Sequence, residues 1–353
     1  MSRLSAVDLF AGAGGATQGL RDAGFRVLAA VENDRDAARS YRRNHRRVLL
    51  LEQDVRLVDP RKLRLDLGLK VGELDLLKAC PPCQGFSTLA KGEVDEERNN
   101  LVLDVRRFVV EMKPKALLLE NVPGLQKDRR LVELVKSLED IGYRFHGVRM
   151  NAEEFGVPQR RKRYILVGLS KSVPATEFPD DLLSLLPSKF DRSRRNAGSA
   201  LRHLERYKRS DDPLDVHRQS NPAVLARIKA IPINGNRFDL PPEHQLDCHK
   251  NMKSRRSAAA SYGRVKLAEP APTMTTRCTT PACGTFVHPE EDRGLTLREA
   301  AVFQTFPLAY TFVGDYGSIE RQIGNAVPVR MAKGLGLIVS SLLGGQDKPT
   351  EGA

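Results

Sequence analysis

A short apolar segment near the start of the chain runs directly into a glycine-rich turn. Ser5 to Phe10 has the pattern of a buried strand, Ala11-Gly12-Ala13-Gly14-Gly15 follows, and residues 16–23 have a helical pattern that ends at Gly24. This order opens doubly wound sheets that bind nucleotides, because glycine lets the backbone approach a ligand where a helix begins. The spacing differs from the dinucleotide fingerprint, since Thr17 stands where a third glycine is expected.

Two further apolar segments each lead to an acidic residue. Residues 25–31 lead to Glu32, and residues 48–51 lead to Asp54. An acid at the end of the second strand is well placed to bind a ribose diol, and Asp54 could accept a hydrogen bond from an adenine amino group. The alternative for Glu32 is a solvated surface position. Together with the glycine turn, the two acids predict a pocket for an adenosine-type ligand.

The same alternation of strand and helix patterns continues along the chain. We expect further strands at residues 74–77, 115–119, 143–150 and 163–169, and further helices at residues 35–44, 98–112, 131–138, 297–303 and 329–343. This alternation predicts an α/β fold with a doubly wound, mostly parallel sheet.

Chemically reactive residues follow three of the later strands. The turn Cys80-Pro81-Pro82-Cys83 presents a thiol at the carboxyl end of one strand, because the prolines end the ladder there. Glu120 ends the next strand and could hydrogen-bond or protonate a substrate, or it could simply be an acid near a helix start. Residues 160–163 are four consecutive cations after Gln159, which form a phosphate-binding cluster or a solvated charge run. We favour the phosphate-binding cluster.

These segments resemble, in order and spacing, the motifs of the C5-cytosine DNA methyltransferases. The matching segments are Asp8–Gly15, Pro81–Ser87, Glu120–Val122, Gln159–Arg163 and Gln322–Pro328, and the resemblance covers about residues 1–169 and 270–340. It implies the Rossmann-like fold of class I methyltransferases, which depend on S-adenosyl-L-methionine (SAM). It also implies a smaller irregular target-recognition domain. The implied reaction is methyl transfer from SAM to carbon 5 of cytosine, flipped out of a specific double-stranded DNA sequence.

The resemblance also implies how the chain is divided. Residues 1–169 with about 318–343 form the SAM-binding catalytic domain, about 170–317 form the target-recognition domain and its supporting hinge, and 344–353 form a disordered tail. Residues 170–269 are rich in Pro, Ser, Asn and Arg, so a loose solvated insert is the alternative. The spacings in this interval match no usual zinc site, so we expect no metal and solvent-facing histidines at His203, His217, His244 and His249.

Site residues follow from the matching positions. Cys83 aligns with the nucleophile, Glu120 with the acid that contacts the cytosine ring, Arg163 with the arginine that contacts the cytosine, and Arg161 with its neighbour. The implied SAM contacts are Phe10, Ala11, Gly12, Gly14, Gly15, Glu32, Asp54, Leu101 and Asn325. The implied DNA contacts are Gln84, Ser87, Gln159, Arg160 and Thr273.

The charge and composition bear on partners and location. A formal net charge of +13 suggests a polyanionic partner such as nucleic acid, although a merely soluble basic surface is the alternative. The chain has no apolar run long enough to span a membrane and no signal-peptide pattern. With the resemblance, these features imply a monomer in the bacterial cytosol or nucleoid that binds double-stranded DNA. The resemblance also allows a companion restriction endonuclease that acts on the same site.

Three other functions stay open at this point. The pair Cys80 and Cys83 could be a redox or metal dithiol, but Cys278 and Cys283 are too far apart to form a second such pair. A C5-cytosine RNA (tRNA) methyltransferase could use the same fold, although the Cys-Phe-Thr element typical of that branch is missing. A DNA-binding module without catalysis is disfavoured by the presence of Cys83, Glu120 and Arg163.

Overall fold

The chain divides into two compact units in the computed structural model, which describes residues 3–82, 96–174, 177–247 and 261–344. Unit 1 comprises Met1–Asn151, Lys162–Arg192 and Val329–Ala353, and unit 2 comprises Ala152–Arg161 and Ser193–Pro328. The catalytic domain was expected to end at residue 169 and to resume at about 318, whereas unit 1 extends to Arg192 and resumes at Val329. The expected domain boundaries stay predictions. The predicted tail, apart from Gly344, lies outside the described residues.

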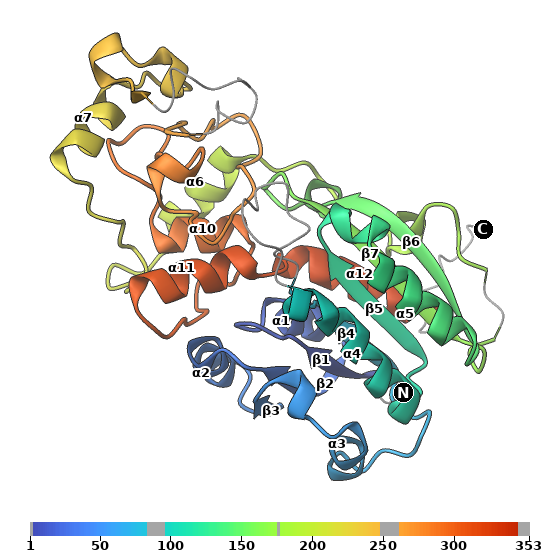
Figure 1. Cartoon of the computed structure of the whole chain (residues 1–353). Helices are drawn as coiled ribbons and strands as arrows, with labels where there is room; N and C mark the ends of the chain where they lie inside the picture. Colours follow the sequence, from blue (N-terminus) through green and yellow to red (C-terminus); the bar gives the residue numbers. More distant parts are fainter. Residues whose placement is uncertain (1–2, 83–95, 175–176, 248–260, 345–353) are drawn as a thin grey trace. The chain divides into compact units, whose positions relative to one another are not determined.

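Unit 1 is built on one seven-stranded sheet with the order β3-β2-β1-β4-β5-β7-β6 (Figure 1). The first five strands are parallel, and β7 runs antiparallel to both of its neighbours. The predicted α/β fold with a mostly parallel sheet is therefore confirmed. The strands are β1 (Ser5–Leu9), β2 (Arg26–Glu32), β3 (Leu49–Glu52), β4 (Leu76–Ala79), β5 (Ala116–Asn121), β6 (Tyr143–Asn151) and β7 (Lys162–Ser170).

Helices cover both faces of this sheet, so the central strands are apolar on both sides (Figure 1). Alternate residues of β2 show the two faces: Ala29 and Val31 pack into the large core cluster, whereas Ala30 packs with Tyr41 in a second cluster. Helices α4 and α5 cover one face, and α1, α2 and α12 lie on the other. The helices of unit 1 are α1 (Gly15–Asp22), α2 (Arg35–Asn44), α3 (Pro60–Asp66), α4 (Glu96–Met112), α5 (Arg129–Glu139) and α12 (Val329–Leu342).

Helices α1 and α12 approach each other closely through glycine. A Cβ atom built on Gly19 would lie 2.4 Å from the carbonyl oxygen of Val329 and 2.5 Å from the Cβ of Ala332. On α12, a Cβ atom built on Gly336 would lie 2.8 Å from the Cβ of Ala23. Because no real Cβ contact is this short, both glycines are needed for the observed helix spacing.

Unit 2 is irregular but packed. Asn196 and Thr296 each form a capping box, which starts α6 and α10. An apolar cluster of Ile228, Ile231, Leu240, Tyr262 and Val287 gives the unit a small core of its own, which argues against a loose insert. Among the described helices, none is long and apolar enough to cross a bilayer. The helices of unit 2 are α6 (Ala197–Tyr207), α7 (Pro222–Ala230), α10 (Leu297–Phe303) and α11 (Tyr316–Asn325).

Candidate functional site

The loop after β1 offers open backbone to a ligand. Phe10, Gly12 and Gly14 have positive φ angles of 59°, 56° and 96°, and α1 begins at the next residue. Apart from its chain neighbours, no described atom would lie within 4 Å of a Cβ built on Gly12, so the space beside this glycine is open. The Phe10 ring packs against the core cluster that contains Leu101. The loop therefore combines an open backbone with an apolar wall.

Glu32, at the end of β2, holds this loop in place. Its Oε2 atom accepts a hydrogen bond from the backbone N–H of Gly12 at 2.7 Å, and its Oε1 atom accepts one from the N–H of Asp34 at 2.7 Å. Burial raises the pKa of Glu32, although these two hydrogen bonds oppose the rise. A carboxylate can accept about four hydrogen bonds. Glu32 therefore keeps acceptor capacity for a ribose diol.

The other two residues expected to line the same pocket are less closely tied to the loop. Asp54 follows β3, and the guanidinium of Arg56, whose Nη2 lies 2.7 Å from Asp54 Oδ2, lowers the pKa of that carboxyl. Asn325 is the last residue of α11 in unit 2 and is exposed. The structure thus brings together the glycine loop and Glu32, and Leu101 belongs to the core cluster against which Phe10 packs.

A row of buried polar side chains connects the elements around the loop. Thr17 donates a hydrogen bond to Asp8 Oδ2 at 2.7 Å, and its hydroxyl lies 3.0 Å from that of Tyr41. Lys78 on β4 pairs with Asp8, with Nζ 2.8 Å from Oδ1. Burial alone would lower the pKa of Lys78, but the attraction of Asp8 raises it above its ordinary value. The sequence analysis did not identify Lys78 as part of the site. The signal that could have found it is a cation directly after an apolar segment, where a strand is expected.

His45 supports the same loop from the end of α2. Its Nδ1 lies 3.0 Å from Nη1 of Arg21 and its Nε2 lies 3.2 Å from the carbonyl oxygen of Gly14. Arginine can only donate, so Nδ1 accepts and Nε2–H donates to the loop. Burial, together with the charge of Arg21, lowers the pKa of His45 to about 4. The neutral imidazole therefore holds Gly14, a role that no sequence signal indicated.

A second group of polar residues lies where β5 ends. Glu120 pairs with Arg163 of the antiparallel strand β7, with Nε 2.8 Å from Oε1. The thiol of Cys80 donates a hydrogen bond to the other carboxylate oxygen, Oε2, at 3.0 Å. Glu120 is buried, and Arg163 is largely so. Two of the predicted catalytic residues are therefore in direct contact, and Cys80 joins them.

The start of the cysteine turn is fixed by backbone contacts. The N–H of Cys80 donates to the carbonyl of Leu9, and the side-chain amide of Asn121 donates to the carbonyl of Pro81 at 3.0 Å. The predicted nucleophile and two predicted DNA contacts come after this point, and they lie outside the described residues: Cys83, Gln84 and Ser87.

Two residues of the cationic segment are buried within unit 2. Gln159 donates from Nε2 to Phe303 O and Gln304 Oε1, and its Oε1 accepts from the N–H of Met274. Arg161 donates to the carbonyl oxygens of Met274 at 2.9 Å and Gly324 at 3.3 Å. These contacts join three distant segments of unit 2. They favour a structural role for both side chains over a direct contact with a substrate.

The neighbouring Arg160 is exposed, and Thr273 is half-buried. Arg160 forms an ion pair with Glu269, and the hydroxyl of Thr273 donates to the carbonyl oxygen of Arg160. Arg160 lowers the pKa of Glu269. Both residues remain accessible to a polyanion, and a phosphate would have to compete with Glu269 for Arg160.

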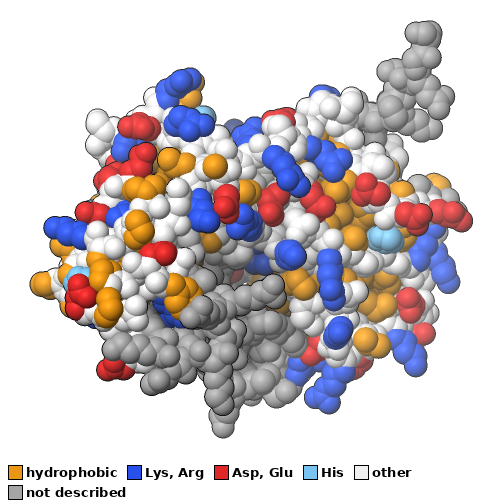
Figure 2. Space-filling model, turned by 90° about the horizontal axis from the view of Figure 1, so that it is seen from above, with side chains coloured by type: hydrophobic (Ala, Val, Ile, Leu, Met, Phe, Trp, Pro, Cys, Tyr) orange, Lys and Arg blue, Asp and Glu red, His pale blue; other side chains and the backbone are white. Residues whose placement is uncertain are grey.

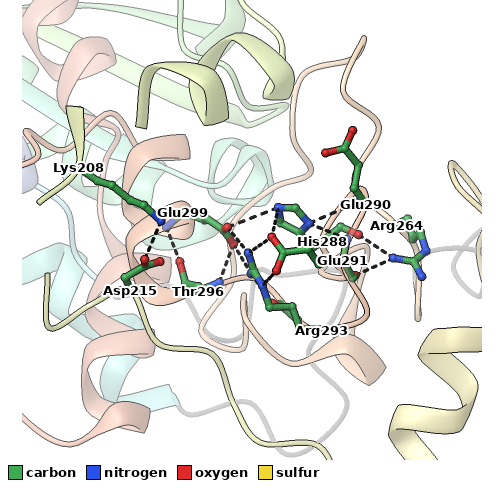
Figure 3. A network of polar contacts seen from close by, with 10 residues as sticks. Lys208, Asp215, Arg264, His288, Glu290, Glu291, Arg293, Thr296 and Glu299 are labelled. Carbon is green, nitrogen blue, oxygen red and sulfur yellow. Dashed lines mark hydrogen bonds and ion pairs between the residues drawn. The ribbon is translucent and has the colours of Figure 1, made fainter. Parts of the chain in front are cut away.

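A cluster of charged side chains stiffens another loop of unit 2 (Figure 3). Arg293 donates to both carboxylate oxygens of Glu291 and of Glu299. His288 Nδ1 accepts from the N–H of Glu291, while Arg264 donates to the carbonyl oxygens of His288 and Glu291. Burial lowers the pKa of His288, and Glu299 opposes this only in part. The cluster joins protein groups to one another, and sequence reasoning did not find it.

Comparison with known proteins identifies what the chain is similar to. A sequence model described as C-5 cytosine-specific DNA methylase matches residues 4–339. The Type II methylase M.HgiDII of Herpetosiphon aurantiacus is 32% identical over an alignment of 350 residues, which covers 96% of this chain and 96% of that protein. The Type II methyltransferase M.PspPI of Psychrobacter sp. is 35% identical, with 98% of this chain and 80% of that protein covered.

Solved structures extend the similarity. A prophage-encoded protein of E. coli, assigned as a DNA modification methyltransferase, superposes with a TM-score of 0.68 and 26% identity, over 97% of this chain and 99% of that one. The S. pombe Dnmt2 methyltransferase superposes with a TM-score of 0.67 over 97% and 99% of the two chains. Its identity is only 18%, so that match shows a shared fold alone.

Proposed function

Because the chain belongs to the C-5 cytosine-specific DNA methylase family, whose reaction is SAM-dependent methyl transfer to carbon 5 of cytosine, we propose that Cys83 is its nucleophile and that Glu120 and Arg163 bind the target base. The contact between Glu120 and Arg163 at the end of β5 carries this proposal. It puts a carboxylate and a guanidinium together one strand away from β4, after which the cysteine turn begins.

The residues around the glycine loop fit SAM. The open space beside Gly12 leaves room for a ligand at the start of α1, and Glu32 has acceptor capacity for the ribose hydroxyls. Asp54 would accept from the adenine amino group, and Leu101 with Phe10 would supply apolar walls. The remaining proposed contacts are Ala11, Gly14, Gly15 and Asn325. When bound, SAM supplies a methyl group on a positively charged sulfur.

The chemical problem is that carbon 5 of cytosine is a poor nucleophile. In the proposed reaction the Cys83 thiolate adds to carbon 6, which moves electron density onto carbon 5. Carbon 5 would then form its bond to the methyl group as the bond between that methyl group and the donor sulfur breaks, with the electron pair staying on the sulfur. Loss of the carbon 5 proton to water and of the cysteine sulfur from carbon 6 would restore the aromatic ring and the Cys83 thiolate.

Glu120 and Arg163 would stabilise the ring while it is covalently bound. Glu120 would contact ring nitrogen 3 and the exocyclic amine, where charge changes during the addition, and Arg163 would hold the base in position. Oε1 of Glu120 is buried and, although Arg163 lies close to it, it accepts no aligned hydrogen bond from the described residues. That oxygen would be satisfied by a base.

DNA would be bound through the basic residues of the chain. Lys and Arg side chains are spread among acidic and apolar ones on the face shown in Figure 2, in keeping with a net charge of +13. The proposed contacts are Gln84, Ser87, Arg160 and Thr273, with Gln159 and Arg161 supporting them. Phosphate contacts would offset the few kcal/mol needed to flip a base out of the duplex and would make binding salt-dependent.

The names of the relatives support a place in restriction–modification. M.HgiDII and M.PspPI are named as Type II enzymes. We propose that this chain likewise methylates a specific double-stranded sequence in the bacterial cytosol, acts as a monomer and protects its site from a companion endonuclease. No observation favours RNA as the substrate, and RNA is an outcome that the activity assay distinguishes.

The test of this proposal is the Cys83→Ala variant. We expect it to lose methyl transfer by a factor of about 10⁴ or more, since no other group can form the bond to carbon 6, while its affinity for DNA stays close to that of the unmodified protein. The assay measures transfer of labelled methyl from SAM to duplex DNA and to tRNA, with Cys283→Ala as the matched control. Appreciable turnover by Cys83→Ala would refute the mechanism, and transfer to tRNA alone would refute the substrate.

A further inference from the structure

Cys80 has no part in the reaction proposed above, yet its thiol touches the carboxylate on which that reaction depends. The sulfur lies 3.0 Å from Oε2 of Glu120, whereas Nε of Arg163 lies 2.8 Å from Oε1. The two partners therefore approach the carboxylate on different oxygens. A rotation of the carboxylate about its last bond would break both contacts.

The direction of the hydrogen bond follows from the surroundings of the thiol. Burial, followed by the negative charge of Glu120, raises the pKa of Cys80 well above its ordinary value, and the nearby cation of Lys78 opposes this only in part. The thiol is therefore protonated at neutral pH. A protonated thiol can donate, and an ionised carboxylate can only accept, so the S–H group donates to Glu120.

The backbone holds Cys80 firmly enough for such a contact to orient its partner. Cys80 directly follows β4, and its N–H donates to the carbonyl of Leu9 on β1. Pro81, the next residue, is bound through its carbonyl by the side chain of Asn121, which is the neighbour of Glu120 on β5. The thiol and the carboxylate thus lie on adjacent strands whose ends are also tied together.

We propose that Cys80 is a positioning residue, which fixes the orientation of the Glu120 carboxylate so that its other oxygen meets the cytosine ring in one geometry. This inference rests on the proposed role of Glu120. A role in packing alone is the competing explanation, since a small side chain is needed at this position in either case. The two explanations differ in whether a hydrogen-bond donor is required.

Two substitutions at Cys80 separate the explanations. Cys80→Ala removes the donor, whereas Cys80→Ser replaces it with a hydroxyl of similar size. We expect Cys80→Ala to lower the rate constant of methyl transfer about tenfold or more, as misoriented catalytic groups do, with the Kd for DNA, the Kd for SAM and the Tm nearly unchanged. Cys80→Ser is expected to restore most of the lost rate. The readout is single-turnover transfer of labelled methyl to duplex DNA.

A double-mutant cycle tests whether Cys80 acts through Glu120. Glu120→Gln and Glu120→Ala are each expected to be slow. The cycle uses Glu120→Ala, which leaves no acceptor for the thiol, so adding Cys80→Ala to it is expected to change the rate by less than about twofold. A further large drop in the double variant would show that Cys80 acts elsewhere and would overturn the inference. If Cys80→Ala fails to fold, Cys80→Val, which has a similar volume and no donor, replaces it in both comparisons.

The remaining outcomes are distinct. A wild-type rate in Cys80→Ala, or equal losses in Cys80→Ala and Cys80→Ser, would overturn the positioning role while leaving the proposed function intact. A wild-type rate in Glu120→Gln would overturn both the role of Glu120 and this inference. Loss of turnover in Cys83→Ala would then still support the nucleophile, so the two failures can be told apart.

Discussion

His45 connects the protonation of one side chain to the stability of the glycine loop. Its neutral form donates to Gly14 and accepts from Arg21, and a second proton would have to be placed on the nitrogen that faces the guanidinium. The pKa of His45 is therefore about 4 in the folded chain, against an ordinary value of about 6.5. Below pH 6.5 the unfolded chain binds a proton that the folded chain does not, so stability falls as the pH decreases towards 4.

We expect this effect to be measurable with His45→Gln, which keeps a donor and cannot be protonated. Between pH 7 and pH 5 the unmodified protein should lose about 2 kcal/mol more of its free energy of unfolding than the variant does. Urea unfolding at the two pH values provides the measurement. His203→Gln, at an exposed histidine, is the control and should follow the unmodified protein. The same pH dependence in all three proteins would contradict the assignment.

The sequence predicts which acids stand at strand ends but not what binds them. Glu32 and Glu120 were both expected after apolar runs, and both lie at the ends of strands β2 and β5. Their partners, the Gly12 N–H and the Cys80 thiol, are 20 and 40 residues distant in the chain. Such pairings depend on strand order and register, which no local pattern encodes, and so the support given to each acid appears only in the structure.

At the scale of elements, the packing of α1 on α12 depends on one missing side chain. Gly19 lies inside α1, where alanine would ordinarily stabilise a helix by up to about 1 kcal/mol. In this protein the added methyl would meet the backbone of Val329 and Lys333, at 2.4 and 2.6 Å. Backbone atoms cannot move aside as a flexible side chain can, so the clash should outweigh the gain in helix propensity.

Gly19→Ala is therefore expected to destabilise the protein by about 1–3 kcal/mol, the usual range for overpacking. Gly317→Ala is the matched control, because Gly317 is also helical and the new Cβ would lie 3.5 Å from Oδ1 of Asp315 and 3.7 Å from Nη1 of Arg321, which is ordinary contact. That variant should be neutral or slightly more stable. Thermal unfolding of both variants gives the comparison. An unchanged Tm in Gly19→Ala would show that α1 and α12 can move apart with little loss of free energy of unfolding.

Elements with clear end signals were predicted best. Helices α2 and α10 occupy the predicted residues, since Asp34 and Thr296 cap their first turns. Strand β4 was expected at residues 74–77 but covers Leu76–Ala79, because Lys78 is tolerated inside the sheet by its pairing with Asp8. The helices α3, α6, α7 and α11 were missed. Three of them belong to unit 2, where α6, α7 and α11 span 11, 9 and 10 residues, and helices this short depend on tertiary contacts.

At the scale of the whole molecule, buried polar contacts join distant segments of unit 2 into a framework. Arg161 binds the carbonyls of Met274 and Gly324, and Gln159 binds Met274 and the end of α10. These contacts fasten residues 159–161 to residues 274–324 and involve no residue between 193 and 269. They can therefore be retained when residues 193–269 are exchanged.

We expect that exchanging residues 193–269 for those of a relative will move the methylated sequence to that of the relative and keep the reaction unchanged. The reason is that base readout needs side chains specific to each target, whereas none of the residues proposed to bind SAM or to act on the base lies between 193 and 269. Sequencing DNA from expressing cells after cytosine conversion identifies the site, and the reciprocal exchange is the control. An unchanged methylation site would place specificity outside this stretch.

The discontinuity of both units along the chain limits how such a protein can evolve by recombination. The backbone passes between the two units four times, after residues 151, 161, 192 and 328. Neither unit is encoded by one uninterrupted stretch of gene, and α12, which packs on α1, is supplied by the last segment. Recombination can replace the interior of unit 2, but it cannot transfer either unit as a single block. The two units must therefore be inherited together.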